Sequence, residues 1–392
     1  MGSSKERDVI VVGAGPAGST TATGLAQKGY DVLLLDRHEF PRDKTCGDAV
    51  PAGAIETMTR LGMGDKIKAA EARGELYRLH GMRLVSPRGH VANAEFHQGR
   101  HGGESYVAPR FYFDAIIQNH AVASGAEFCK ADVKEPMLEN GRVVGVQARV
   151  NGQVEEMRAK VVVDAAGVTS PLLRAMRPES NQHVDLHRAV ALRAYIEDIE
   201  IYPGQVEFFL YNDILPGYAW IFPTGDEQAN IGLGMRLDLF RKLKKNLKKM
   251  LDEFMQMPDI KKRIKRGGEI RDVAIWQLNF GSQRHLQHVY DGALLVGDAA
   301  GFINPLTGGG IHNAIISADL ATQVIDASLQ KGDTSRSQMQ YYEGLVHDAM
   351  WDSMKRSFFM QRTLMRFPFL IDFLVKRMST NNSFTKAFLE KL

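Results

Sequence analysis

The sequence predicts an α/β protein in which a Rossmann-like domain carries an inserted antiparallel-sheet domain and ends in a helical segment. Near the amino terminus, the β-branched run Val9–Val12 leads directly into a turn with closely spaced glycines. Far downstream, a second apolar run, 293–296, ends in Gly297 and Asp298. Between them lie segments that alternate or are rich in aromatic residues, as antiparallel strands are. We therefore expect one nucleotide-binding domain built from two distant stretches of sequence.

The first turn has the glycine spacing of a dinucleotide-binding fingerprint. Gly13 permits the tight turn, Gly15 lets the backbone approach a pyrophosphate, and Gly18 lets the following helix pack closely on the strand. That helix is expected over residues 18–28, directly after Ala17. Its amino end would point free N–H groups at the phosphates, where the helix dipole also favours anions.

An acidic residue ends the next predicted strand. Residues 31–35 form this strand, and Asp36 follows them. A carboxylate in this place accepts hydrogen bonds from ribose hydroxyls, either in NAD or in the adenosine half of FAD, and it repels a 2′-phosphate. NADP is therefore not expected in this crevice. Arg37, the next residue, is expected at the same edge of the nucleotide.

The downstream strand end indicates a flavin site rather than a plain NAD site. After Gly297 and Asp298 the chain runs through a glycine-rich segment into a predicted helix, 311–328. Free N–H groups at the start of such a helix suit the N1 and C2=O edge of a flavin, because reduction builds negative charge there. We predict one FAD, held jointly by both stretches. The residues expected at its ring are Pro305, Gly308, Gly309, Gly310 and Ile311.

At this point the chain resembles FAD enzymes of the p-hydroxybenzoate hydroxylase fold, in which the Gly-Asp pair meets the ribityl chain, so Asp298 is expected there. Two further segments, Phe40–Asp48 and Pro216–Pro223, resemble the geranylgeranyl reductase family of flavoproteins. That family saturates isoprenoid double bonds in lipids and in chlorophyll side chains. The resemblance runs from about residue 8 to residue 329 and implies a Rossmann-like FAD-binding domain, a substrate-binding sheet and alkene reduction.

The resemblance also implies roles for individual residues. Arg110, just before a predicted helix, stands where the family has an arginine that contacts FAD. Cys46 and Gly47 are expected beside the flavin. Tyr218 and Trp220 belong to the family's aromatic motif and are expected to line the substrate cavity. Of these, the cysteine, the tyrosine and the tryptophan are the predicted catalytic residues.

The sequence leaves two interpretations open for each catalytic candidate. A thiol near the cation of Lys44 can have a lowered pKa and act as proton donor or thiolate, or Cys46 is a small residue packed beside the ring. Tyr218 and Trp220 share one face of a strand. They line a prenyl-chain cavity, with the tyrosine hydroxyl as a proton source, or they fill a half-buried sheet. Cys129 is expected to be inert core.

The predicted domains interleave along the chain. The FAD-binding domain is expected to comprise residues 1–73, 105–181 and 273–329. The substrate-binding sheet domain is expected to comprise residues 74–104 and 182–272. The C-terminal helical segment is expected to comprise residues 330–392. Because ligands commonly bind at seams between domains, the sheet should roof the flavin.

Two basic segments leave open whether the protein contacts a lipid surface. Residues 241–254 place Leu243 and other apolar residues on one helical face, with lysines opposite. This predicts a solvated surface helix or one that is attracted to anionic lipid. Residues 350–378 mix aromatic and basic side chains, and Pro368 divides them into two helices. That segment either caps the core or rests in a membrane interface.

A local turn signal predicts one hairpin within the FAD-binding domain. The pair Asn151-Gly152 is typical of a two-residue hairpin turn. It would join strands 142–150 and 154–158.

Composition is that of a globular cytoplasmic protein. The chain is 44% hydrophobic and 24% charged, with two cysteines, which indicates a reducing compartment without a disulfide framework. It shows no apolar secretory segment and no run near the ~20 residues of a membrane span, so any membrane contact should be peripheral. A net charge of +3, with no aromatics interleaved among the cations, does not favour nucleic acid. No metal-ligand spacing is present, and Asp48 and His312 are interpreted as isolated polar groups.

Other activities on this fold stay open at this stage. A flavin monooxygenase would hydroxylate or epoxidise a lipophilic compound, and oxygen uptake would reveal it. A flavin-dependent halogenase is less favoured because residues 217–223 lack the first tryptophan of the Trp-x-Trp-x-Ile-Pro motif typical of those enzymes. A flavin-binding sensor is disfavoured by the cavity motif. The electron donor is NADPH or a reduced carrier protein. Ala166 before Gly167, where many relatives have an Asp-Gly pair, argues against a hydroxylase-like use of nicotinamide.

Overall fold

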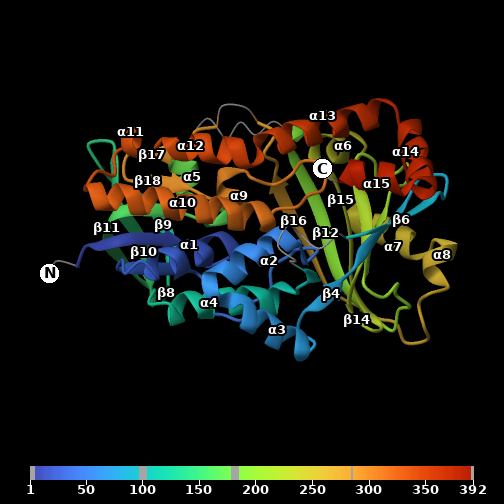
Figure 1. The fold of residues 1–392 in the computed structure, drawn as a ribbon, viewed down its shortest axis with the longest axis horizontal. Helices are drawn as coiled ribbons and strands as arrows, with labels where there is room; N and C mark the ends of the chain where they lie inside the picture. Colours follow the sequence, from blue (N-terminus) through green and yellow to red (C-terminus); the bar gives the residue numbers. More distant parts are fainter. Residues whose placement is uncertain (1–4, 97–103, 178–184, 284–285, 390–392) are drawn as a thin grey trace.

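Two large β-sheets lie side by side, each with helices packed on it (Figure 1). The computed structural model describes residues 5–96, 104–177, 185–283 and 286–389. The first sheet has the strand order β17-β18-β11-β1-β2-β8, with β10 and β9 continuing from β11. Its strands are β1 (Arg7–Val12), β2 (Val32–Asp36), β8 (Glu127–Lys130), β9 (Asp132–Glu139), β10 (Arg142–Val150), β11 (Gln153–Asp164), β17 (Val289–Tyr290) and β18 (Ala293–Leu295).

The first sheet is covered on both faces, as its apolar sequence requires. Strands β11, β1, β2 and β8 are parallel neighbours, and β18 runs parallel beside β11. Val9 and Val11 of β1 pack on helices α1 (Pro16–Ala26) and α10 (Ile311–Lys331). Ile10 and Val12 point the other way, towards β9 and β10. The turn after β1 therefore sits at the carboxyl edge of a parallel sheet, where nucleotides bind in this class of fold.

The second sheet roofs this edge. It has the strand order β16-β12-β15-β14-β13-β5-β6, with antiparallel neighbours except for the parallel pair β13 and β5. Its strands are β5 (Gly81–Val85), β6 (Val91–Glu95), β12 (Arg188–Glu197), β13 (Gln205–Phe209), β14 (Tyr218–Gly225), β15 (Gln228–Arg236) and β16 (Ile270–Asn279).

The two faces of the second sheet have different partners. Ala219 and Ile221 of β14 pack with Leu251 and Phe254 of helix α7 (Leu247–Met255). The alternate residues of β14, Tyr218, Trp220 and Phe222, point to the opposite face. There they meet a small sheet of β3 (Ala49–Val50), β4 (Tyr77–Leu79) and β7 (Ser105–Val107). One strand thus presents an apolar core on one side and an aromatic wall on the other.

The remaining helices surround these sheets. Those not yet given are α2 (Ala52–Met58), α3 (Gly64–Ala72), α4 (Arg110–Ala123), α5 (Pro171–Met176), α6 (Leu237–Lys242), α8 (Pro258–Lys261), α9 (Gly297–Ala300), α11 (Arg336–Met339), α12 (Tyr341–Val346), α13 (Asp352–Arg366), α14 (Phe369–Thr380) and α15 (Asn382–Leu389). Helix α14 packs on β6 through Ile371, Val375 and Met378 against Ala92. The C-terminal helices thereby close the far edge of the second sheet (Figure 1). The expected break at Pro368, between α13 and α14, is confirmed.

Two local expectations need correction. The strand expected at 154–158 is only the beginning of β11, which continues to Asp164 and carries the chain from the hairpin into the parallel part of the first sheet. Leu243 is 52% exposed and does not join the buried face of α7. The helix is interrupted there, because α6 ends at Lys242 and Lys244 has a left-handed backbone with φ 48°.

One expected domain boundary falls inside a strand. Residue 273 lies within β16, which pairs with β12 from Ile270 to Asn279. By its hydrogen bonds the whole strand belongs to the second sheet. The alternation that marks a half-buried edge strand runs over residues 273–278, within the stretch that was expected to belong to the FAD-binding domain.

Candidate active site

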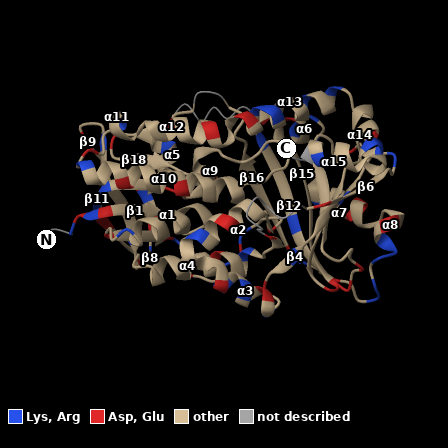
Figure 2. Cartoon of the chain, in the orientation of Figure 1, with Lys and Arg blue, Asp and Glu red and all other residues tan. Residues whose placement is uncertain are grey.

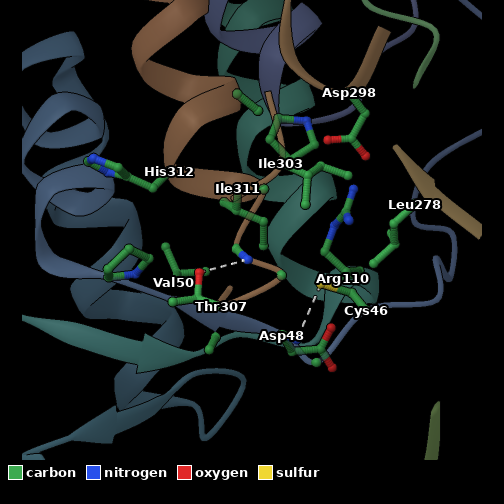
Figure 3. Close-up of a pocket in the computed structure, with 18 of the residues that line it drawn as sticks. Cys46, Asp48, Val50, Arg110, Leu278, Asp298, Ile303, Thr307, Ile311 and His312 are labelled. Atoms are coloured by element: carbon green, nitrogen blue, oxygen red, sulfur yellow. Dashed lines mark hydrogen bonds between the residues drawn. The ribbon is translucent and has the colours of Figure 1, made fainter. Parts of the chain in front are cut away.

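A cavity of about 1620 Å³ lies between the glycine turn after β1 and the aromatic face of the second sheet. Except for Gly18, the residues predicted from the sequence to bind cofactor or to act in catalysis line it. Figure 3 draws 18 of its lining residues and labels ten of them, among them Cys46, Arg110 and Asp298. The structure therefore brings the two distant sequence stretches to one place.

Two glycines of this turn, Gly13 and Gly18, have no room for a side chain. Gly13 has φ 99°, and a Cβ added to it would lie 2.5 Å from the carbonyl oxygen of Ala165. A Cβ on Gly18 would lie 1.7 Å from the carbonyl oxygen of Gly13. This close contact explains why Gly18 does not line the cavity, because its role is to pack α1 against β1. Helix α1 begins without a side-chain cap, so its first N–H groups face the cavity side unpaired by side chains.

Two arginines converge on this turn. Nη2 atoms of Arg42 and Arg110 lie 3.7 and 3.8 Å from the position of a Cβ on Gly15. Arg110 makes two hydrogen bonds to the buried carboxylate of Asp114, at 2.6 and 2.7 Å, and Arg42 Nη1 lies 2.8 Å from the same carboxylate. Two cations share one anion, which leaves a net positive charge beside the start of α1. This is a site for a pyrophosphate.

Arg42 was not among the residues predicted to bind the cofactor. The sequence offers a weak signal, since the residue stands within the Phe40–Asp48 segment, and nothing local connects it to Asp114. The connection exists only because the loop after β2 folds against α4.

Asp36 stands at the end of β2 as expected. Its Oδ2 accepts a hydrogen bond from the Ala14 amide at 2.9 Å, and its Oδ1 accepts one from the His38 amide at 2.9 Å. The carboxylate thus ties the glycine turn to the second strand while it lines the cavity. Arg37 beside it is exposed and donates from Nε to His38 Nε2 at 3.1 Å.

The loop before α10 presents backbone to the cavity. Asn304 Oδ1 accepts hydrogen bonds from the amides of Leu306 and Thr307, which folds the loop back on itself. Gly308 has φ 67°, and a Cβ on Gly310 would lie 3.1 Å from Oδ1 of Asp298. Helix α10 also begins without a side-chain cap. Its free N–H groups and Asp298 therefore lie at one place, as a flavin and its ribityl chain require.

Asp298 and Lys44 share the interior of the cavity. Burial raises the pKa of Asp298, while Lys44 and Arg110 oppose that shift. Lys44 Nζ lies 3.3 Å from the ring centroid of Trp276 in β16. Burial, followed by the charge of Arg110, lowers the pKa of Lys44 to about 7. Lys44 could not be recognised as a site residue from the sequence, because its burial depends on a strand more than half the chain away.

Cys46 is a thiol rather than a thiolate. Burial raises its pKa, and the charge of Asp48 raises it further, against a smaller effect of Arg110. Of the two interpretations that the sequence leaves open for Cys46, the one with a lowered pKa is not supported, because desolvation of the anion dominates. Cys46 Sγ accepts a hydrogen bond from the Asp48 amide at 3.3 Å (Figure 3). Asp48 itself is not isolated, since Tyr195 and Asn230 donate hydrogen bonds to it.

Tyr218 and Trp220 form part of an aromatic wall. The ring centroids of Tyr218 and Trp220 are 5.9 Å apart, and Phe208 lies 5.3 Å from Tyr218 and 5.1 Å from Phe222. The Tyr218 hydroxyl donates to the carbonyl of Thr307, in the loop before α10. Burial raises the pKa of Tyr218, so its hydroxyl stays protonated. The wall is thus joined directly to the second glycine-rich loop.

These features fit FAD as the resident cofactor. Arg42, Arg110 and the start of α1 would hold its pyrophosphate, Asp36 its ribose, and the start of α10 with Asp298 the flavin end. The glycine positions at which a Cβ would clash with backbone leave the space that such a group needs.

Comparison with known proteins also indicates FAD as the cofactor. Residues 6–357 match the model of a family described as FAD binding domain, and the protein is an FAD-dependent oxidoreductase. It is 32% identical to digeranylgeranylglycerophospholipid reductase 2 of Methanopyrus kandleri over 86% of this chain and 81% of that protein. It is 31% identical to the digeranylgeranylglycerophospholipid reductase of Thermoplasma acidophilum over 87% of this chain and 83% of that protein. The chain belongs to the geranylgeranyl reductase family of these oxidoreductases.

Solved structures give the same fold. A geranylgeranyl bacteriochlorophyll reductase-like protein of Thermoplasma acidophilum superposes with a TM-score of 0.87 at 27% identity, covering 99% of this chain and 96% of the other. The flavin-dependent brominase Bmp2 has a TM-score of 0.73 at 21% identity, covering 98% and 99%. The second likeness concerns the fold alone.

Proposed function

We propose that this protein reduces carbon–carbon double bonds in the isoprenoid chains of a lipid. The observation that carries the proposal is the cavity of about 1620 Å³. Ligand pockets ordinarily measure roughly 300–1,000 Å³, so there is space for a second, elongated ligand beside the cofactor. The relatives named as digeranylgeranylglycerophospholipid reductases support the same class of substrate.

The aromatic wall suits a prenyl chain. Tyr218, Trp220 and Phe222 present apolar ring surface to the cavity, and Phe208 extends it. Such a wall excludes water, and the ring faces attract the positive charge that develops when an unactivated alkene is protonated. A polar substrate would find few partners on this side.

The chemistry needs one hydride and one proton for each double bond. FAD, once reduced, supplies the hydride to one alkene carbon. The second carbon takes a proton, and the chain offers two protonated groups at the cavity, the thiol of Cys46 and the hydroxyl of Tyr218. Burial raises the pKa of both, so both carry a proton at neutral pH. The π pair of the alkene forms the new C–H bond to that proton.

Loss of the Tyr218 hydroxyl together with the Trp220 indole should cost most of the turnover. In the double variant Tyr218→Phe, Trp220→Ala, we expect a rate of lipid reduction lower by roughly 10²–10⁴-fold, the usual range for loss of a general acid. The measurement is anaerobic turnover of a geranylgeranyl lipid, followed by mass spectrometry as the gain of two hydrogens per bond.

Tyr211→Phe is the matched control. That hydroxyl is buried on the other face of the second sheet, beside Phe254, and should leave turnover unchanged. Full activity in the double variant would remove the proposed role of the wall. Oxygen consumption coupled to an oxygenated product would instead identify a monooxygenase.

The electron donor in this proposal is NADPH or a reduced carrier protein. Asp36 closes the adenosine crevice to a 2′-phosphate, so NADPH would have to approach from another side of the cavity. Bleaching of the yellow flavin by each donor under anaerobic conditions distinguishes the two.

We further propose that the C-terminal helices contact a membrane surface. Phe359, Phe369 and Phe373 are 73%, 61% and 62% exposed. Basic side chains accompany them on α13 and α14 (Figure 2), namely Lys355, Arg362, Arg366, Lys376 and Arg377. Helix α15 next to them contributes Asn382 and Lys386 to the cavity lining. A lipid could therefore pass from the bilayer to the cavity at this end. Over the described ranges, no helix has the length and apolar character needed to cross a bilayer.

Binding to vesicles tests this contact. The variant Phe369→Ser, Phe373→Ser should bind vesicles of anionic phosphatidylglycerol weaker by roughly tenfold for each phenylalanine, because burial of such a side chain stabilises by about 1.5–3 kcal/mol. Co-sedimentation measures the effect. Leu138→Ser with Val154→Ser removes comparable exposed side chains from β9 and β11, which flank β10 at the other end, and should change nothing. Equal binding by both variants would contradict the proposed face.

A further inference from the structure

Asp48 is a fully buried carboxylate in the same loop as Cys46, and the chemistry proposed above does not use it. Its backbone has φ 65°, a left-handed conformation that a residue with a side chain adopts only where its surroundings hold it. Its own carbonyl accepts a hydrogen bond from the Ala108 amide at 2.8 Å. The loop is therefore fixed at this residue.

Two strands of the second sheet hold the carboxylate. Oδ2 of Asp48 accepts hydrogen bonds from the hydroxyl of Tyr195 at 2.6 Å and from Nδ2 of Asn230 at 2.7 Å. Oδ1 is buried and has no hydrogen-bond partner in the described structure. A buried carboxylate with one unpaired oxygen is costly, and such groups are kept where they serve a function more often than elsewhere.

The same network reaches both catalytic candidates. Asn230 Nδ2 also donates to the carbonyl oxygen of Cys46 at 2.8 Å, and Asn230 Oδ1 accepts from Trp220 Nε1 at 2.8 Å. The Asp48 amide donates to Cys46 Sγ at 3.3 Å (Figure 3). A Cβ on Gly47 would lie 3.2 Å from the Phe222 ring, so the loop and the wall are in contact. The thiol is thus held close to a fixed anionic group.

Charged groups on several packed elements act on Asp48 and on Cys46. Arg110 on α4 and Arg193 on β12 lower the pKa of Asp48, as do its two hydrogen-bond donors, and burial outweighs them and raises it to about 6. Lys44, Arg110, Asp48 and Tyr218 are among the ionisable groups that interact with Cys46. At neutral pH Asp48 is therefore mostly charged, and it is the anion among these groups that borders the thiol.

We propose that Asp48 is a positioning residue that acts through Cys46. Its buried negative charge, fixed by Tyr195 and Asn230, opposes ionisation of the Cys46 sulfur and so adds to the hold of the thiol on its proton at the cavity. This inference goes beyond the proposed function and depends on no lipid substrate.

The ionisation of Cys46 in the holoenzyme tests the proposal without turnover. The protein is labelled with [3-¹³C]cysteine, and its two cysteine signals are assigned with Cys129→Ser. The Cβ shift distinguishes thiol from thiolate during a pH titration. In the wild type we expect the Cys46 midpoint above that of a free cysteine, about 8.5. In Asp48→Asn we expect a midpoint lower by about one pH unit, because a like charge has been removed.

The variants separate charge from structure. Asparagine at position 48 can still accept the bonds from Tyr195 and Asn230, so only the charge is lost. Glu95→Gln removes an exposed carboxylate at the cavity rim and should leave the Cys46 midpoint where it was. Cys129, which is half-buried in β8 rather than core, should titrate identically in all variants. An unchanged midpoint in Asp48→Asn overturns the proposal.

The wild-type titration decides the matter should Asp48→Asn fail to fold. Ionisation of Asp48 should itself produce a step in the Cys46 signal near pH 6. A Cys46 signal without that step, or a thiolate signal at neutral pH, overturns the proposal. Because FAD is present and no lipid is added, neither outcome depends on whether the enzyme reduces an isoprenoid.

Discussion

Gly18→Ala should yield a colourless protein that does not bind FAD. The added Cβ would lie 1.7 Å from the carbonyl oxygen and 2.9 Å from the carbonyl carbon of Gly13, and 3.1 Å from Cβ of Ala165. All three belong to the packed end of the first sheet, and Gly13 has no freedom to retreat, because it lies against Ala165. Helix α1 must therefore move away from the strand, and its amino end then no longer faces the pyrophosphate site. Flavin content after purification measures the effect, and thermal unfolding should show a lower Tm.

Gly344→Ala provides the matched control. Gly344 lies in α12, and a Cβ there would meet nothing within 4 Å. Alanine in a helix is favoured over glycine by roughly 0.5–1 kcal/mol, so this variant should keep its FAD and be slightly more stable. A yellow Gly18→Ala protein with normal affinity would show that the turn does not approach the cofactor as described.

Arg110→Ala should weaken FAD binding by roughly 10- to 150-fold. A charge-assisted contact to phosphate contributes roughly 1.5–3 kcal/mol, and its loss also alters the buried charge beneath it. Asp114 would keep only Arg42, at 2.8 Å. A buried ion pair that loses one partner costs about 3–5 kcal/mol, so the free energy of unfolding should fall as well. Fluorescence quenching of added FAD gives the Kd.

Two further variants make the Arg110 result specific. Arg110→Lys keeps the charge but loses the bidentate geometry of the guanidinium, so its affinity for FAD should lie between those of the wild type and Arg110→Ala. Arg174→Ala removes an exposed arginine from α5 and should leave FAD binding unchanged. Wild-type affinity in Arg110→Ala would assign the pyrophosphate to some other group.

The sequence was most informative where the role of a residue depends only on its neighbours in the same short segment. The spacing of Gly13, Gly15 and Gly18 is contained in one short segment, and the structure leaves no room for a Cβ at Gly13 or Gly18. Asp298 was found because a glycine-rich run and a helix follow it directly. Tyr218 and Trp220 share a face simply because side chains alternate along a strand.

Residues whose role depends on distant partners escaped notice. Asp48 meets Asn230, 182 positions away, and Lys44 meets Trp276 on an edge strand. No periodicity or spacing encodes such pairs. The choice between the two interpretations of Cys46 could not be made from the sequence for a related reason. A neighbouring lysine is visible in the sequence, whereas the desolvation that raises the pKa of the thiol is a property of the folded interior.

The way in which strands alternate between the sheets limits how this scaffold can be re-engineered. β5 and β6 come from the stretch before α4, whereas β12 to β16 follow α5, and β13 pairs with β5 across that interval. Neither sheet is therefore formed by a single continuous stretch of the chain that could be exchanged on its own. A chimaera that takes its substrate preference from a relative must exchange both stretches at once. Replacing either alone would pair a strand of one protein with a strand of the other at the β13–β5 contact, in the middle of the second sheet.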